Sequence, residues 1–521
     1  MADSWVNSAE ILGSDLHLEL ARAGSRRTAL MAALREAIRD GRLAPDARLP
    51  PYRSLAADLG IARNTVADAY AELVAEGWLT ARQGSGTRVA PRPAPPPPRR
   101  RTPGRGSGGR SAGASGGPRA PRPAPRPVHN LLQGRPDATA FPRTAWLASA
   151  RRALTAAPHE AFGPGDPRGR PELRRALADY LARARGVRTD PGRIVVCSGF
   201  AHALRLLSGT RLLRPRMAVE SYGLAFHRSL LNSAGIRTIP LPLDADGALT
   251  EGLTALDGLR AALLTPAHQF PTGGPLHPER RAAAVAWARE SGGLVLEDDY
   301  DGEFRYDRRP VGAVQGLDPE RVLYLGSVSK SLSPALRLGW MVLPDQLVDR
   351  VLAAKGEREG WTGVIDQLTL ADFIESGGYD GHVRRMRQRY RRRRDQLVAT
   401  LAERAPHVRV SGIAAGLHAV LELPPGTERS ALRAAAWQGL ALDGLGGYRH
   451  PDATTPHPDG LVVGYATPPE HSFAGALDAL CRALPPDQTD QTDQTDQTDR
   501  TDRTDRTDRT DRTDQTDQTA T

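Results

Sequence analysis

The sequence is poor in residues that build disulfide or zinc scaffolds. Its 521 residues include only two cysteines, Cys197 and Cys481, and the 13 histidines show no ligand spacing. Two thiols cannot form a disulfide framework or a four-thiolate zinc site, so we expect no structural metal. No apolar run approaches the roughly 20 residues that cross a bilayer, and residues 1–12 lack the basic flank and apolar core of a signal peptide. We therefore expect a cytoplasmic protein.

Lysine is almost absent, although the chain is basic. Of 70 basic residues only Lys330 and Lys355 are lysines, and the net charge is +10. Arginine serves wherever only positive charge is needed, so a retained lysine can mark a position that requires a primary amine. The alternative is that each of the two lysines is present by chance and has no chemical role. Residues 487–521 hold 11 aspartates and five arginines and so contribute −6, which leaves +16 for the rest and favours an anionic partner.

The composition divides the chain into two folded domains, a linker and a tail. Residues 91–127 consist almost entirely of Pro, Arg, Gly, Ser and Ala, which predicts a disordered linker. Residues 487–521 repeat Gln/Arg-Thr-Asp without a hydrophobic position, which predicts a disordered tail. Residues 128–486 alternate helical patterns with short β-branched runs, as α/β domains with a largely parallel sheet do. Residues 14–90 then form a separate N-terminal domain.

The N-terminal domain shows a helix-turn-helix pattern. Two short helices are predicted over 53–59 and 63–74, on either side of a turn at Gly60. Residues 79–89 then alternate polar and apolar positions, as the hairpin of a wing does. The second helix would present the residues of its N-terminus to the DNA major groove: Arg63, Asn64 and Thr65. By itself, this pattern fits a small protein-binding module equally well.

A longer motif favours the DNA-binding alternative. It comprises Gly41-Arg42-Leu43, Leu49-Pro50, Arg53, Leu55-Ala56, Leu59-Gly60, Arg63, Thr65-Val66, Ala69-Tyr70, Leu73, Glu76-Gly77 and Gly84-Ser85-Gly86-Thr87. With these residues the region resembles the winged helix-turn-helix of the GntR family, an α+β fold. The resemblance implies that five residues contact the operator: Arg53, Arg63, Asn64, Thr65 and Gly84. Tyr52 stands where the family usually has serine, which affects one expected backbone contact.

The retained Lys330 lies in a loop that suits a phosphate. Gly326-Ser327-Val328-Ser329-Lys330 follows a predicted strand over 322–325, and Arg337 comes soon after. Two hydroxyls and a guanidinium can hold a phosphate, while an amine beside them can condense with an aldehyde. Pyridoxal phosphate needs both, and it needs an acid at its ring nitrogen, which Asp298 at a strand end can supply. Tyr300 would reach the ring's phenolic oxygen from the same strand end.

Taken singly, these motifs have ordinary explanations as a plain loop and a solvated strand end. Further motifs accompany them: Phe162-Gly163, Asp166-Pro167-Arg168-Gly169, Leu173-Arg174, Tyr180-Leu181, Arg185-Gly186, Thr265-Pro266-Ala267-His268-Gln269-Phe270-Pro271-Thr272-Gly273, Glu297-Asp298-Asp299-Tyr300-Asp301, Glu303-Phe304-Arg305-Tyr306 and Arg337-Leu338-Gly339. Together they resemble the fold type I aminotransferases and, more closely, the MocR/GabR family of regulators. The fold class predicted for residues 128–486 is therefore the α/β fold of type I pyridoxal-phosphate-dependent transferases.

This resemblance implies roles for the matching residues. Lys330 would bond to the aldehyde of pyridoxal 5′-phosphate, Asp298 would pair with its ring nitrogen, and Tyr300 with its ring oxygen. The phosphate would be held by Ser327, Ser329 and Arg337, and by the backbone N–H groups of Ser198, Gly199, Phe200 and Ala201.

The substrate side of the site is less well defined. The family uses an arginine near the C-terminus for the substrate carboxylate, and Arg449 is the candidate; an ordinary surface arginine is the alternative. Family members usually stack an aromatic residue on the cofactor ring, but Glu220-Ser221-Tyr222-Gly223-Leu224 places leucine at that position. Either Tyr222 takes over the stacking or the stacking is lost.

The sequence thus predicts a transcriptional regulator. A winged helix-turn-helix would bind an operator in double-stranded DNA, and an aminotransferase-like domain would bind pyridoxal phosphate and sense an amino compound or the cofactor itself. Because fold type I proteins build their sites at a dimer interface, the family implies a homodimer. One alternative is a working aminotransferase with an accessory DNA-binding domain. Another is a DNA-binding protein whose large domain only dimerises.

Overall fold

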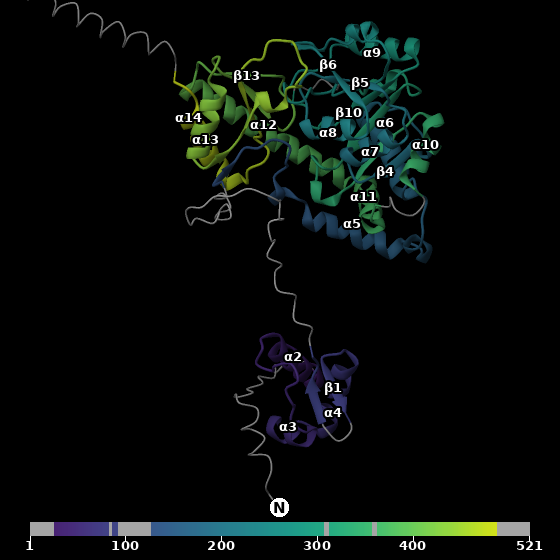
Figure 1. Ribbon diagram of the computed structural model, residues 1–521, viewed down its shortest axis with the longest axis vertical. Helices are drawn as coiled ribbons and strands as arrows, with labels where there is room; N and C mark the ends of the chain where they lie inside the picture. Colours follow the sequence, from purple (N-terminus) through teal and green to yellow (C-terminus); the bar gives the residue numbers. More distant parts are fainter. Residues whose placement is uncertain (1–24, 83–85, 92–126, 307–311, 357–361, 487–521) are drawn as a thin grey trace, which may run out of the picture. The chain divides into compact units, whose positions relative to one another are not determined.

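The computed structural model describes residues 25–82, 86–91, 127–306, 312–356 and 362–486, in two compact units (Figure 1). Most of the predicted linker and the whole predicted tail lie outside these ranges, as does Gly84. The two units are described separately below.

The smaller unit is a three-helix bundle followed by a hairpin. It contains α2 (Arg26–Arg39), α3 (Tyr52–Leu59), α4 (Arg63–Ala75), β1 (Leu79–Arg82) and β2 (Gly86–Val89), and the two strands pair antiparallel. Gly60 ends α3 in the left-handed conformation at φ 60°, which opens the turn into α4. Leu34, Val66 and Leu73 form the centre of the core. The predicted helix-turn-helix and wing are therefore confirmed.

A seven-stranded sheet forms the centre of the larger unit. Its order is β4 (Ile194–Cys197), β12 (Gly339–Val342), β11 (Val322–Ser327), β10 (Leu294–Asp298), β9 (Leu259–Leu264), β5 (Arg216–Glu220) and β6 (Arg237–Leu241). Strand β12 is antiparallel to both of its neighbours, whereas the pairs among β11, β10, β9, β5 and β6 are parallel. The sheet is mixed but largely parallel, as predicted.

Helices cover both faces of this sheet, because successive strand residues point to opposite sides. On one side Val196 and Val342 pack in a core with residues of α6 (Pro171–Arg185) and α11 (Val364–Glu375). On the other, Val195 and Met341 pack with residues of α7 (Phe200–Gly209) and α10 (Asp345–Lys355). The same unit contains α5 (Arg143–Ala156), α8 (Ala225–Ser233), α9 (Pro278–Ser291), β7 (Leu243–Asp244) and β8 (Gly247–Ala248).

The C-terminal part of the larger unit comes after the long helix α12 (Gly378–Arg404) in the sequence and contains a second sheet. A four-stranded sheet runs β13 (Arg409–Ser411), β14 (Ala419–Glu422), β17 (Gly460–Val463) and β16 (Asp443–Gly444), accompanied by α13 (Glu428–Trp437) and α14 (Glu470–Ala483). Strand β3 (His129–Asn130) pairs in parallel with β15 (Leu440–Ala441), so the start of the unit is joined to its C-terminal part. No helix in the described ranges is long and apolar enough to cross a membrane.

A buried ion pair fixes the turn that follows β10. Arg185 at the end of α6 donates from Nε to Asp299 Oδ2 at 2.6 Å and from Nη2 to Asp299 Oδ1 at 3.0 Å. Tyr324 donates its hydroxyl to the same carboxylate at 2.7 Å, and the two charged side chains are 5% and 2% exposed. The Arg185–Asp299 pair therefore ties α6 to the strand end that carries Asp298.

Replacing Arg185 by alanine should destabilise the larger unit strongly, because Asp299 would keep a buried charge without its partner. We expect a loss of about 3–5 kcal/mol in the free energy of unfolding, measured by urea denaturation. Arg183→Ala is the matched control, since Arg183 pairs with Asp380 at 2.8 Å on the exposed surface; it should cost less than about 1 kcal/mol. Equal losses for the two variants would contradict this assignment.

Candidate cofactor and DNA-binding sites

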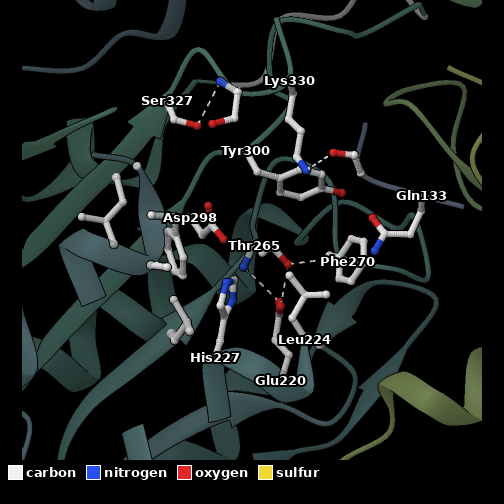
Figure 2. A pocket seen from close by; sticks show the side chains of 18 of the residues that line it. Gln133, Glu220, Leu224, His227, Thr265, Phe270, Asp298, Tyr300, Ser327 and Lys330 are labelled. Atoms are coloured by element: carbon white, nitrogen blue, oxygen red, sulfur yellow. Dashed lines mark hydrogen bonds between the residues drawn. The ribbon is translucent and has the colours of Figure 1, made fainter. Parts of the chain in front are cut away.

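A cavity of about 280 Å³ lies at the carboxyl ends of the central strands (Figure 2). Asp298 and Tyr300 reach it from the end of β10, Ser327 to Lys330 from the end of β11, and Gly199 and Phe200 from the start of α7. Open α/β sheets bind ligands at this edge, because the loops after parallel strands diverge there. The structure thus brings together residues that lie more than 100 positions apart.

Lys330 extends its amine into the wall of the cavity. Its Nζ donates a hydrogen bond to the carbonyl oxygen of Gly134 at 2.5 Å. Burial lowers the pKa of Lys330, while the negative charges of Asp301 and then Asp298 oppose that shift. A lysine whose pKa is lowered loses its proton more readily and becomes a better nucleophile.

The second lysine has different surroundings. Lys355 at the end of α10 is buried, and its Nζ donates to the carbonyl oxygens of Pro167 at 2.5 Å and Val196 at 2.7 Å. It does not line the cavity. Lys355 therefore joins chain segments away from the cavity, whereas Lys330 lines the cavity.

Asp298 presents an unpaired carboxyl group to the cavity. No hydrogen bond joins its carboxyl group to any other residue of the described part of the chain. Burial, and after it the charge of Asp299, raises the pKa of Asp298 well above its usual value. A buried carboxylate without a partner is costly, and a cation placed against it removes that cost. The group fits a protonated ring nitrogen.

The other end of the cavity offers donors to an anion. Ser327, Ser329 and Arg337 all line it. Gly199 adopts φ 101°, and a Cβ atom on it would lie 3.9 Å from both terminal nitrogens of Arg337. Within the described ranges, the N–H groups of Gly199, Phe200 and Ala201 at the start of α7 have no backbone acceptor. These donors fit a phosphate group.

Ser198 does not join this set. Its N–H donates to Nδ1 of His202 at 3.0 Å, and the residue does not line the cavity. Three of the four predicted N–H donors of this turn therefore remain available.

The structure does not bring Arg449 into the cavity. Its Nη2 donates to the carbonyl oxygens of Ala453 at 2.5 Å and Thr455 at 2.8 Å. These two contacts occupy the guanidinium, and Arg449 does not line the cavity. Arg228 of α8 lines the cavity instead, but it too donates to carbonyl oxygens, those of Gly223, Tyr448 and Arg449.

Tyr222 and Leu224 both line the cavity. The Tyr222 hydroxyl lies 3.2 Å from Nδ1 of His457, a residue that does not line the cavity. Leu224 packs against the hydrophobic cluster that contains Phe270 (Figure 2). The structure thus keeps both possibilities for the ring contact that the sequence left open.

Several lining residues were not predicted as site residues: Gln133, Gly134, His227, Thr265, Phe270 and His418. Thr265 and Phe270 belong to the motif from Thr265 to Gly273 quoted above, so the sequence could have indicated that they line the site. Thr265 donates its hydroxyl to Glu220 Oε2 at 2.5 Å, and burial raises the pKa of Glu220 to about 7. Gln133 and His418 come from distant segments without a motif, and only the fold places them here.

The smaller unit exposes the predicted DNA contacts. Arg53, Arg63 and Asn64 are exposed and Thr65 is half-buried at the starts of α3 and α4. Within the described ranges no carboxylate forms an ion pair with Arg53 or Arg63. Cζ of Arg63 lies 5.3 Å from the centre of the Tyr52 ring, so this tyrosine contacts the first residue of α4, the predicted recognition helix.

These features define a class: a winged helix-turn-helix joined to an aminotransferase-type domain. Residues 27–89 match the model of bacterial regulatory proteins of the gntR family, and residues 127–441 match that of aminotransferase class I and II. The chain therefore belongs to the family of HTH-type transcriptional regulators that carry an aminotransferase-like domain.

Relatives with curated names support this membership. The chain is 34% identical to the probable rhizopine catabolism regulatory protein MocR of Rhizobium meliloti, over 84% of this chain and 89% of that protein. It is 32% identical to the pyridoxine biosynthesis transcriptional regulator PdxR of Corynebacterium glutamicum, over 88% and 95%. Among solved structures, Pyrococcus horikoshii kynurenine aminotransferase matches 69% of this chain and 90% of its own, with a TM-score of 0.62 and 25% identity.

His418 should make stability depend on pH. Burial, and after it the nearby His268, lowers the pKa of His418 to about 3, whereas an unfolded histidine titrates near 6.5. The unfolded state therefore takes up the proton first, and the contribution of His418 falls as pH falls below 6.5. We expect the difference in unfolding free energy between wild type and His418→Asn to shrink by about 2 kcal/mol from pH 7 to pH 5.

Urea denaturation at the two pH values measures this difference. His471→Asn, on the exposed surface of α14, is the control and should show no such change. A difference for His418→Asn that is independent of pH would refute the assignment.

Proposed function

We propose that this regulator binds pyridoxal 5′-phosphate in the cavity and that the ligand state of the cavity governs DNA binding. The observation that carries the proposal is the position of Lys330 in one cavity with the unpaired carboxyl group of Asp298. An amine, an acid and anion-binding donors line one cavity, which is the set that this cofactor requires. When bound, the cofactor supplies an aldehyde that condenses with amines and a ring that withdraws electrons.

The residues of the chain divide the work of binding. Lys330 provides the amine, Asp298 faces the ring nitrogen, and Tyr300 faces the ring oxygen. The phosphate is held by Ser327, Ser329, Arg337 and the N–H groups of Gly199, Phe200 and Ala201. Tyr222 or Leu224 contacts the ring, and Arg449 remains a candidate for an effector carboxylate only if its carbonyl contacts are released.

The effector is a small amino compound or the cofactor itself. Lys330 links the loop after β11 to Gly134, so a ligand that favours one arrangement of this contact shifts the equilibrium toward it. We further propose a homodimer, in which two DNA-binding units suit repeated half-sites. On DNA, Arg53, Arg63, Asn64, Thr65 and Gly84 contact the operator.

A working aminotransferase is the second candidate function. The observation in its favour is that Lys330, Asp298 and Tyr300, the residues that the family resemblance makes catalytic, all line the cavity. Steady production of a keto acid from an amino donor by the purified chain would favour this candidate. If the chain binds no pyridoxal phosphate at all, a large domain that only dimerises becomes the better description.

Lys330→Ala should abolish the visible absorption band of the bound cofactor. Wild type incubated with pyridoxal phosphate should show a band that borohydride bleaches, because an amine of the chain bonds to the aldehyde. Lys355→Arg is the control: it removes the other ε-amine, keeps the charge, and should retain the band. An undiminished band in Lys330→Ala would disprove the role of Lys330.

Arg63→Ala should weaken operator binding by roughly 1–3 kcal/mol and relax specificity at one base position. Arg39→Ala is the matched control, because Arg39 lies 5.2 Å from the Trp78 ring but on α2 rather than on the recognition helix. Titration of DNA fragments selected by the wild-type protein, and of single-base variants of them, measures both quantities. Unchanged specificity in Arg63→Ala would remove Arg63 from the set of base-reading residues.

A further inference from the structure

The side chains of Tyr52 and Arg63 contact one another on the surface of the smaller unit. Each is the first residue of its helix, α3 and α4 respectively, and the turn at Gly60 lies between the two helices. Cζ of Arg63 lies 5.3 Å from the centre of the Tyr52 ring, and this tyrosine is 42% exposed. A guanidinium at that distance from an aromatic ring is held by a cation–π interaction. The roles proposed above use Arg63 but give none to Tyr52.

The backbone that leads into Tyr52 is held by two other parts of the unit. Tyr70 of α4 is buried and donates its hydroxyl to the carbonyl oxygen of Pro50 at 3.0 Å. Leu49, one residue earlier, donates its N–H to the carbonyl oxygen of Thr87 in β2 at 2.9 Å. The chain before α3 is thus attached to both α4 and the hairpin. These contacts fix the point at which the Tyr52 side chain leaves the backbone.

Contact with a ring occupies the flat face of the Arg63 guanidinium and leaves its edge free. The five N–H donors of a guanidinium lie in its plane, so an aromatic ring against the face does not use them. A carboxylate would use them. Within residues 25–82 and 86–91, however, no group accepts a hydrogen bond from Arg63 and no carboxylate pairs with it. The ring therefore orients Arg63 while all of its donors stay available to a ligand.

An oriented guanidinium suits a guanine in the major groove of DNA. Two of its planar donors match the O6 and N7 acceptors of guanine, which is the commonest specific contact between a protein and a base. A long side chain loses rotamer freedom when it binds, and one that is already held in place loses less. A phosphate needs positive charge but no fixed plane. The ring should therefore favour the reading of a base by Arg63 over a contact with phosphate.

We propose that Tyr52 is a positioning residue for DNA recognition: its ring holds the Arg63 guanidinium so that Arg63 reads a guanine of the operator. This inference rests on the proposed contact between Arg63 and the operator. It adds that residue 52, which reads no base itself, sets how strictly that base is chosen. Serine, the usual residue at this position in the family, has no ring and could not hold the guanidinium in this way.

Selection of DNA by the full chain tests this inference. Wild type and variants are each incubated with a pool of random-sequence duplexes, and the retained duplexes are sequenced. Wild type should enrich guanine at one position, and Arg63→Ala should lose that preference. Tyr52→Leu removes the ring, so it should weaken the preference and lower the affinity for the duplex that wild type enriches most by roughly two- to fivefold. Tyr52→Phe keeps the ring and should retain both the preference and the affinity.

The effect of Tyr52 must also pass through Arg63. In an Arg63→Ala background, Tyr52→Leu should cause no further loss of affinity for the same duplex. A full further loss would mean that Tyr52 contacts DNA itself and would overturn the positioning role, as would equal losses for Tyr52→Phe and Tyr52→Leu. Arg39→Ala breaks a contact of the same kind on α2, with Trp78 at 5.2 Å, and should change neither preference nor affinity. A change equal to that of Tyr52→Leu would overturn the specific role of Tyr52.

The same selection separates a failure of this inference from a failure of the proposed operator contact. If Arg63→Ala leaves the enriched bases unchanged, the proposed contact of Arg63 fails and the role of Tyr52 fails with it. If Arg63→Ala abolishes the preference for guanine while Tyr52→Leu leaves it intact, only the role of Tyr52 fails. Dependence on Arg63 at a base other than guanine would overturn the geometry proposed for the guanidinium.

Discussion

The site depends on one buried ion pair. Arg185 and Asp299 hold the end of β10 against α6, and side chains alternate along a strand and its extension. With Asp299 fixed on the far side, Asp298 and Tyr300 on either side of it turn toward the cavity. Asp298 and Asp299 are neighbours in the sequence but differ in their partners. Arg185 neutralises Asp299 within the fold, whereas the carboxyl group of Asp298 is available to a ligand.

Burial gives this edge of the sheet an unusual charge balance. Burial raises the pKa values of Glu220, Glu297 and Glu303 to about 7, and that of Asp298 further above its usual value. Near neutral pH the three glutamates are partly protonated, so this part of the structure is less negative than its composition suggests. A cationic group facing Asp298 would restore its charge. The cavity therefore favours a ligand that is positive at one end and negative at the other.

The sequence allowed the fold class and the Lys330 loop to be predicted, because both depend on local patterns: alternating helix and strand signals, a hydroxyl-rich loop, and acids at strand ends. The roles assigned to these residues stay predictions. The position of Arg449 could not be foreseen, since its direction depends on the carbonyl oxygens of Ala453 and Thr455. Gln133 and His418 carry no local signal either; tertiary packing alone brings them to the cavity.

The pairing of β3 with β15 has a mechanical consequence. The larger unit begins at Pro121, and β3 is its first strand. Four residues beyond β3 is Gly134, whose carbonyl oxygen accepts the Lys330 hydrogen bond. Tension on β3 would reach the cavity wall through this short stretch, which is anchored by the β3–β15 pairing and by hydrogen bonds from Gly464 to Leu131 and from Thr467 to Leu132. Strand β3 and this part of the cavity wall are one continuous stretch of backbone.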